Sequence, residues 1–342
     1  MSGLQRLGIT FPYMVAPMVG LSHVAMRELV RSYLPPDVQA LRFTEMLSTR
    51  RLPGERLGAS NELRYAQGES HFVPQLLGND EEFIAKSIRR LLPAKPWGFD
   101  INMGCPVKHT LRHNWGVRLM GDAPYAAKVV AMTKRHSPLP VSVKMRGGID
   151  KLDTDYLTRF TDELEKAGAD WLTIHPRSRA QKHSGEADWQ MVAELKARRS
   201  VPVVTNGNIQ TADDAIRVVE NFGVDGAMIG RAITARPWLL GQIAQKTGLG
   251  GIANIPETPE EESREYFRAL DRLGALMDQY FAGEDYKLQK MRFFVATGSK
   301  WFLFGHSFWK YCMKKTTFAE LRERIAEYGA KHQYPIRQRI EL

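Results

Sequence analysis

Two hydrophobic patterns alternate along the first 245 residues. Short β-rich apolar runs are separated by longer stretches whose apolar residues recur every three or four positions, as in helices packed on a sheet. The runs predict eight strands at residues 13–16, 40–45, 72–77, 98–102, 141–144, 171–175, 201–206 and 226–229. The stretches predict helices that include residues 81–92, 124–135, 155–167, 188–197 and 211–222, with Asp80, Asp122 and Thr211 as caps.

This alternation indicates a parallel sheet, and eight units fit an α/β fold of the (β/α)8 TIM-barrel type, which typically needs about 250 residues. A doubly wound open sheet is the alternative, but its G-x-G-x-x-G fingerprint is absent. Residues 247–262 (TGLGGIANIPETPEEE) break the pattern with a Gly/Pro-rich linker and a helix start, and 262–281 are strongly helical. We therefore expect a catalytic barrel at 1–246 and an all-α domain at 247–342.

Composition narrows the class of protein. The 342 residues carry a net charge of +10, and no stretch approaches the roughly 20 apolar residues that span a bilayer. The N-terminus does not resemble a signal peptide, and two cysteines cannot form a disulfide framework. We expect a soluble, cytoplasmic, monomeric protein without membrane contact, and the basic balance makes a polyanion a plausible partner.

The basic excess lies near the C-terminus. Residues 286–342 hold 12 Lys or Arg and 4 Asp or Glu, so they carry +8 of the total +10. Within them, residues 286–318, here the basic-aromatic segment, contain ten aromatics and no acid. Its seven cations are Lys287, Lys290, Arg292, Lys300, Lys310, Lys314 and Lys315. One interpretation is a small helical domain whose core contains most of these aromatic rings and whose basic side chains face solvent. The absence of acidic residues instead favours contact of this segment with RNA or DNA.

Polar or glycine-flanked residues end nearly every predicted strand. In order they are Pro17 and Met18, Glu45, Gln75, Asn102, Lys144, His175, Asn206, and Gly230 with Arg231. Because the carboxyl ends of barrel strands line the active site, this set predicts a polar ring around one ligand. Capping of the loops is the alternative explanation.

The last two strand ends indicate a phosphate site. Asn206-Gly207-Asn208 and Gly230-Arg231 follow strands seven and eight, where such barrels usually bind phosphate, and glycine lets backbone N–H groups approach an anion. Lys144 would lie opposite in the pocket. It is either a Schiff-base nucleophile or a cation beside a cofactor ring or a developing oxyanion.

Asn102-Met103-Gly104-Cys105-Pro106 places one of the two cysteines on the fourth loop. A thiol there serves as a nucleophile or a proton donor, whereas Cys312 lies among aromatics and is expected in the core. No metal site is predicted, because the cysteines are far apart and no histidine pair has a ligand partner at suitable spacing.

The motifs together resemble the dihydrouridine synthases, flavin enzymes that reduce uridine in RNA, chiefly tRNA. They are APM (16–18), PQLLG (74–78), DINMGCP (100–106), VKMRGG (143–148), HPRSRAQ (175–181), NGNI (206–209) and IGRA (229–232). They occur in the family's order, and N-x-G-C-P is the most specific. Pro176 stands where the family often has glycine, and Asn208 where it often has an acid.

The resemblance implies a set of ligand contacts. FMN would lie against Pro17, Met18, Gln75, Lys144 and His175, with its phosphate on Asn206, Gly207, Asn208, Gly230 and Arg231. Asn102, Arg146 and Arg177 would face the uracil, and Cys105 would be the acid. Hydride would reach C6 of the uridine and a proton C5, with NADPH as reductant and tRNA held by the basic-aromatic segment. Three alternatives remain: a dihydroorotate dehydrogenase-like flavin barrel, a Schiff-base aldolase using Lys144, and a non-catalytic RNA-binding barrel.

Overall fold

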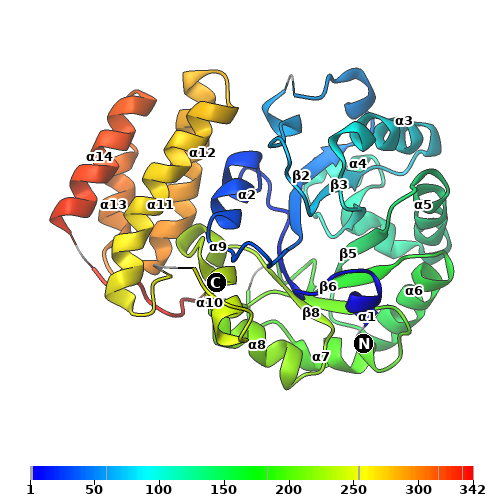
Figure 1. Ribbon diagram of the computed structural model, residues 1–342. Helices are drawn as coiled ribbons and strands as arrows, with labels where there is room; N and C mark the ends of the chain where they lie inside the picture. The colour runs from blue at the N-terminus through cyan, green and yellow to red at the C-terminus, as the bar shows by residue number, and fades with distance from the viewer. Residues whose placement is uncertain are drawn as a thin grey trace.

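The eight predicted strands form a closed parallel barrel in the order β1 to β8 (Figure 1). The computed structural model describes residues 3–58, 60–182, 184–252, 255–314, 316–332 and 334–341. The strands are β1 (Tyr13–Val15), β2 (Arg42–Ser48), β3 (Phe72–Leu77), β4 (Phe99–Met103), β5 (Val141–Gly148), β6 (Trp171–Ser178), β7 (Val203–Asn206) and β8 (Gly226–Ile229). β1 pairs with β8 and closes the barrel, which confirms the predicted fold class.

Helices between the strands and after β8 cover the outside of the barrel. They include α2 (Val24–Arg31), α3 (Glu81–Leu91), α5 (Ala123–His136), α6 (Thr154–Lys166), α7 (Trp189–Lys196), α8 (Ala212–Glu220), α9 (Ala232–Ala235) and α10 (Leu239–Lys246). Asp80 and Asp122 accept a hydrogen bond from the third backbone N–H of their helices, and Thr211 forms a full capping box. These caps satisfy N–H groups that the first helical turn leaves unpaired, as the sequence predicted.

Three strands run further than their apolar runs predicted. β2 continues to Ser48, β5 to Gly148 and β6 to Ser178, so Glu45 lies within β2 and does not end it. The register between β2 and β3 shifts between Phe43 and Met46. Met46 consequently lines the barrel mouth, and Glu45 points elsewhere.

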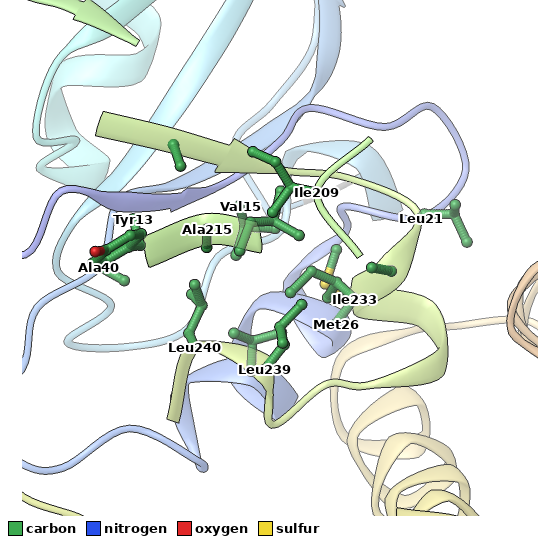
Figure 2. Close-up of a cluster of buried hydrophobic side chains, with 14 of the residues drawn as sticks. Tyr13, Val15, Leu21, Met26, Ala40, Ile209, Ala215, Ile233, Leu239 and Leu240 are labelled. Carbon is green, nitrogen blue, oxygen red and sulfur yellow. The ribbon is translucent and has the colours of Figure 1, made fainter. Parts of the chain in front are cut away.

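The barrel has two apolar cores. Met14, Phe43 and Trp171 belong to the cluster that also contains Leu4 and Val73. A larger cluster lies between the strands and the helices and continues into the C-terminal helices. Figure 2 shows part of it, where side chains from β1 (Tyr13, Val15), α2 (Met26) and α10 (Leu239, Leu240) gather.

Four helices after the barrel pack together on one side of it (Figure 1). They are α11 (Pro259–Tyr280), α12 (Glu284–Gly298), α13 (Gly305–Cys312) and α14 (Phe318–Lys331), with a 3-10 turn η5 (Ser299–Trp301) after α12. Within the basic-aromatic segment, Phe294, Trp301, Phe302, Phe308 and Phe318 are buried, whereas Phe293 and Phe304 are exposed. Half of the ten rings thus build the helical core, and Cys312 is buried with them.

Buried ion pairs join these helices to the barrel. Arg236, which follows α9, pairs with Glu262 of α11 at 2.9 Å, and Lys290 of α12 pairs with Glu45 of β2 at 3.0 Å. The chain then returns to the barrel, and the C-terminus lies near α9 and α10 (Figure 1). There Ile340 exchanges two hydrogen bonds with the side chain of Gln210. Among the described residues, no helix has the length and apolar character needed to cross a membrane.

Candidate active site

A cavity of about 490 Å³ opens at the carboxyl ends of the strands. It lies within the range of 300–1,000 Å³ that small-molecule and cofactor sites occupy. Nearly all of the predicted cofactor and substrate residues line it. They are Pro17, Met18, Gln75, Asn102, Cys105, Lys144, Arg146, His175, Asn206, Gly207, Asn208, Gly230 and Arg231. The strand-end ring therefore surrounds one space.

A chain of hydrogen bonds runs from the barrel interior to the Cys105 loop. Asp100 of β4 is fully buried and accepts hydrogen bonds from Ser142 Oγ at 2.5 Å and Gln75 Nε2 at 2.6 Å. Gln75 Oε1 accepts from Asn102 Nδ2 at 2.7 Å, and Asn102 Oδ1 accepts from the Cys105 N–H at 3.0 Å. Since each amide is oriented by its neighbour, this relay fixes the start of the loop that carries the thiol.

Buried Asp100 and half-buried Lys144 influence each other's charge. Burial raises the pKa of Asp100 to about 7, and burial lowers the pKa of Lys144 to about 8. The charge of each group favours the charged form of the other and opposes the effect of burial. A lysine with a pKa this close to neutrality is a candidate functional group, because it lines the cavity and its charge is easily altered.

The last two strand ends provide unpaired anion donors. Gly207 has φ +117°, and a Cβ there would lie 2.9 Å from the His175 ring, so only glycine fits this turn. In the described ranges, the backbone N–H groups of Gly207, Asn208 and Gly230 donate to no protein acceptor. Burial, and then the charge of Arg177, lowers the pKa of Arg231, which makes no ion pair with any described residue. An anion would satisfy these groups together.

Arg177 is not among the residues that line the cavity. Its side chain is fully buried behind the cavity wall and donates to the carbonyl of Gly185 at 3.2 Å and to Asn208 Oδ1. Its Nη1 lies 3.2 Å from His175 Nε2. Its donors thus hold His175 and Asn208 in place, and the contact of Arg177 with uracil stays a prediction.

Three of the seven predicted tRNA-binding cations have other partners. Lys287 is 8% exposed and pairs with Asp278, and Lys290 is 9% exposed and pairs with Glu45. Arg292 donates to the carbonyl of Lys314 at 2.7 Å. Acids outside the basic-aromatic segment, Asp278 and Glu284 for Lys287 and Glu45 for Lys290, form these pairs, so contact of the two lysines with tRNA stays a prediction. Lys300, Lys310 and Lys314 are exposed, and Lys315 lies outside the described residues.

The helical domain contributes a wall of the cavity that sequence reasoning missed. Phe293, Thr297 and Lys300 line it together with the barrel residues. Their spacing of four and three residues places them on one helix face, but nothing in the sequence indicates which strand ends that face meets. The buried role of Asp100 was missed for the same reason, although it lies in the quoted DINMGCP motif.

The chain matches the family model for dihydrouridine synthase (Dus) over residues 14–327. It belongs to the dihydrouridine synthase family. The match extends from β1 through most of α14, so it includes both the barrel and the helices that complete the cavity.

Curated members of the dihydrouridine synthase family align with most of the chain. It is 33% identical over 246 residues to "Probable tRNA-dihydrouridine synthase 1" of Synechocystis sp., which covers 72% of this chain and 68% of that protein. It is 31% identical over 249 residues to "tRNA-dihydrouridine synthase B" of Pseudomonas aeruginosa, covering 73% and 74%. A "Probable tRNA-dihydrouridine synthase" of Mycobacterium tuberculosis is 31% identical over 302 residues, covering 86% and 75%.

Proposed function

We propose that this dihydrouridine synthase family member reduces the C5=C6 bond of specific uridines in tRNA to dihydrouridine, using FMN and NADPH. The observation that carries the proposal is one cavity bounded by Cys105, Lys144, His175 and Arg231, whose rim includes Lys300 of the helical region. The names of the relatives support tRNA as the substrate. We assign the barrel (1–246) to catalysis and the helical region (247–342) to tRNA binding.

The residues present fit FMN. Gly207, Asn208, Gly230 and Arg231 offer N–H and guanidinium donors without an acidic partner among the described residues, as a phosphate requires. Away from these phosphate donors, Lys144 offers a cation to the polar edge of the flavin ring, and Met18 offers the ring an apolar surface. FMN bound here and reduced by NADPH would supply hydride to C6 of the uracil.

The remaining polar groups suit the base. Negative charge develops toward the C4 carbonyl as C6 is reduced, and cationic or N–H donors stabilise it. Asn102 and Arg146 line the cavity near Cys105, and Arg146 is held by the carbonyls of Gly104 and Ser178. Cys105 holds the proton that C5 requires, and its half-exposed loop gives a flipped-out base access to the thiol.

Flavin content and tRNA-dependent turnover test this function. The purified protein should be yellow with noncovalent FMN, and NADPH should be consumed faster when unmodified tRNA is added. An enzyme acting on a free pyrimidine would respond to dihydroorotate or uracil and not to tRNA. A colourless protein that reacts with a carbonyl substrate upon borohydride trapping at Lys144 would instead support an aldolase.

Arg231→Ala should weaken FMN retention. The substitution removes a charge-assisted contact to phosphate, worth about 1.5–3 kcal/mol, so the dissociation constant should rise roughly 10- to 150-fold. Fluorescence titration of apoprotein with FMN measures this. Arg236→Lys is the control for handling of the protein, because Arg236 lies close by in sequence but pairs with Glu262 outside the cavity. Unchanged affinity in Arg231→Ala would remove Arg231 from the phosphate site.

Asp100→Asn should disturb the relay to Cys105 and the charge of Lys144. An amide at this position cannot accept from both Ser142 and Gln75 as the carboxylate does, so we expect roughly a 10-fold loss of kcat. The charge of Asp100 raises the pKa of Lys144, so its removal lowers that pKa further. The alkaline fall in activity should therefore shift to lower pH.

Ser142→Ala is the matched control for Asp100→Asn. It removes one hydrogen bond from the same carboxylate but keeps its charge and the bond to Gln75. Its pH profile should resemble that of wild type. A pH profile of Asp100→Asn that coincides with the wild-type curve would show that Asp100 does not act on Lys144.

Lys310→Ala/Lys314→Ala should weaken tRNA binding and flatten its dependence on salt. Both lysines are exposed. A plot of the logarithm of the binding constant against the logarithm of the salt concentration should become less steep by about one for each phosphate that is no longer bound. Lys86→Ala/Lys166→Ala on α3 and α6 is the charge-matched control. Measuring the tRNA affinity of both double variants at several salt concentrations tests this prediction. An equal salt dependence for the two would place the tRNA contact elsewhere, such as around Lys108 and Arg112.

A further inference from the structure

The rim of the cavity exposes apolar side chains on both sides of the opening. Val19 after β1 is 58% exposed, Val107 after Cys105-Pro106 is 53% exposed, and Phe293 of α12 is 45% exposed. Val19 and Phe293 themselves line the cavity, and Val107 directly follows Pro106, which also lines it. Exposed apolar residues gathered at one opening mark a contact surface more strongly than scattered ones do.

Phe293 is held at this rim by the barrel. A Cβ at Gly20 would lie 2.9 Å from two carbons of the Phe293 ring, so the ring rests against this glycine, whose φ is +81°. The Gly20 N–H donates to Glu45 Oε2 at 2.7 Å, and the same carboxylate accepts from Lys290 of α12. One buried carboxylate thus fixes both the loop beneath the ring and the helix that carries it.

The ring has room for a flat partner. No aromatic side chain of the described residues stacks on Phe293, in contrast to Phe304, which lies 4.8 Å from the Tyr334 ring. Two turns further along the same face of α12 and η5, Lys300 is exposed and makes no ion pair within the described part of the chain. An apolar ring with an unpaired cation beside it is complementary to a nucleobase and its phosphate.

We propose that Phe293 stacks on the nucleobase adjacent to the target uridine, while Lys300 contacts a phosphate of the same strand. The inference rests on the proposed function. The target base occupies the cavity beside Cys105, so the next nucleotide must cross the rim where Phe293, Val19 and Val107 lie. Phe293 is then a specificity-determining residue: it selects uridines whose neighbour can leave its own stack.

The first test compares three variants at Phe293 and one control. Phe293→Ala should raise the KM for tRNA about 10- to 100-fold with little change in kcat, since base–aromatic stacking contributes at this level. Phe293→Trp should have the same KM for tRNA as wild type or a lower one. The KM of Phe293→Leu should lie between those of wild type and Phe293→Ala. Phe304→Ala is the matched control, because Phe304 is an equally exposed aromatic of the same domain that does not line the cavity.

The second test removes the base instead of the ring. The uridine that wild-type protein reduces is mapped first, and tRNAs are then made with an abasic site on either side of it. One of these tRNAs should bind wild type about 10- to 100-fold more weakly, and Phe293→Ala should bind it and the intact tRNA equally. Circular dichroism and FMN content confirm that each variant is folded.

The outcomes separate the two proposals. Wild-type protein that reduces no uridine in tRNA overturns the proposed function. If the wild-type protein does reduce uridine in tRNA, two results overturn the stacking role. One is a KM of Phe293→Ala equal to that of wild type. The other is that the abasic site weakens binding by Phe293→Ala as much as it weakens binding by wild type.

Discussion

Cys105→Ala should reduce uridine in tRNA about 100- to 10,000-fold more slowly than wild type, because loss of a general acid typically has this effect. FMN and tRNA should bind normally, since the Cys105 side chain donates no hydrogen bond to the described residues that form the phosphate and ring contacts. Single-turnover measurements with pre-reduced protein isolate the step that needs the proton.

Two comparisons give this prediction its controls. NADPH oxidation with a small artificial acceptor should proceed at the wild-type rate in Cys105→Ala, because that reaction does not require a proton on C5. Cys312→Ala removes the other thiol, which is buried among the C-terminal helices, and folded protein should keep full activity. If Cys105→Ala reduced tRNA at the wild-type rate, the thiol would be structural and the proposed protonation step wrong.

Lys290→Met should destabilise the protein by about 3–5 kcal/mol. Lys290 and Glu45 are both largely buried, and removing one partner leaves the other charge without compensation in a medium that solvates it poorly. Of the donors that the described residues offer, Glu45 would keep the Gly20 N–H alone. The urea concentration at the midpoint of unfolding should fall accordingly, whereas the dependence of the unfolding free energy on urea concentration should not change.

Glu45→Gln provides the second half of this cycle. The double variant Glu45→Gln/Lys290→Met should recover much of the stability that Lys290→Met removes, because no unpaired charge remains buried. Lys300→Met removes an exposed cation from η5, the 3-10 turn that follows α12, and should leave the unfolding midpoint nearly unchanged. A Lys290→Met protein as stable as wild type, but with weaker tRNA binding, would restore Lys290 to the predicted phosphate contacts.

Local chemistry made the barrel predictable. The period of the apolar residues distinguishes strands from helices, and caps such as Asp80 and Thr211 act within three residues of their own position. Strand lengths were less predictable, because β5 and β6 end in Arg146-Gly147-Gly148 and Pro176-Arg177-Ser178, which lack the β-rich apolar residues that mark the predicted runs. The position of Glu45 depends on a shift of register against β3, which β2 alone does not encode.

The site was predictable where one strand end supplies one group. Lys144, His175 and Arg231 reach the cavity because the barrel gathers the carboxyl-terminal halves of its strands and the residues that follow them, although β5 and β6 continue past Lys144 and His175. Contacts between distant elements were not predictable: Lys290 lies in an acid-free segment, yet Glu45 of β2 pairs with it in the fold. The same limit hid Phe293 at the rim, since only tertiary packing brings α12 to the barrel mouth.

Mass spectrometry of tRNA after reaction tests the central claim most directly. Unmodified tRNA transcript is incubated with the full-length protein, FMN and NADPH, digested to nucleosides and analysed for uridine that has gained two hydrogen atoms. The account predicts dihydrouridine at defined positions with wild type and almost none with Cys105→Ala. Wild-type protein that retains FMN and oxidises NADPH yet forms no dihydrouridine in any tRNA tested would contradict it.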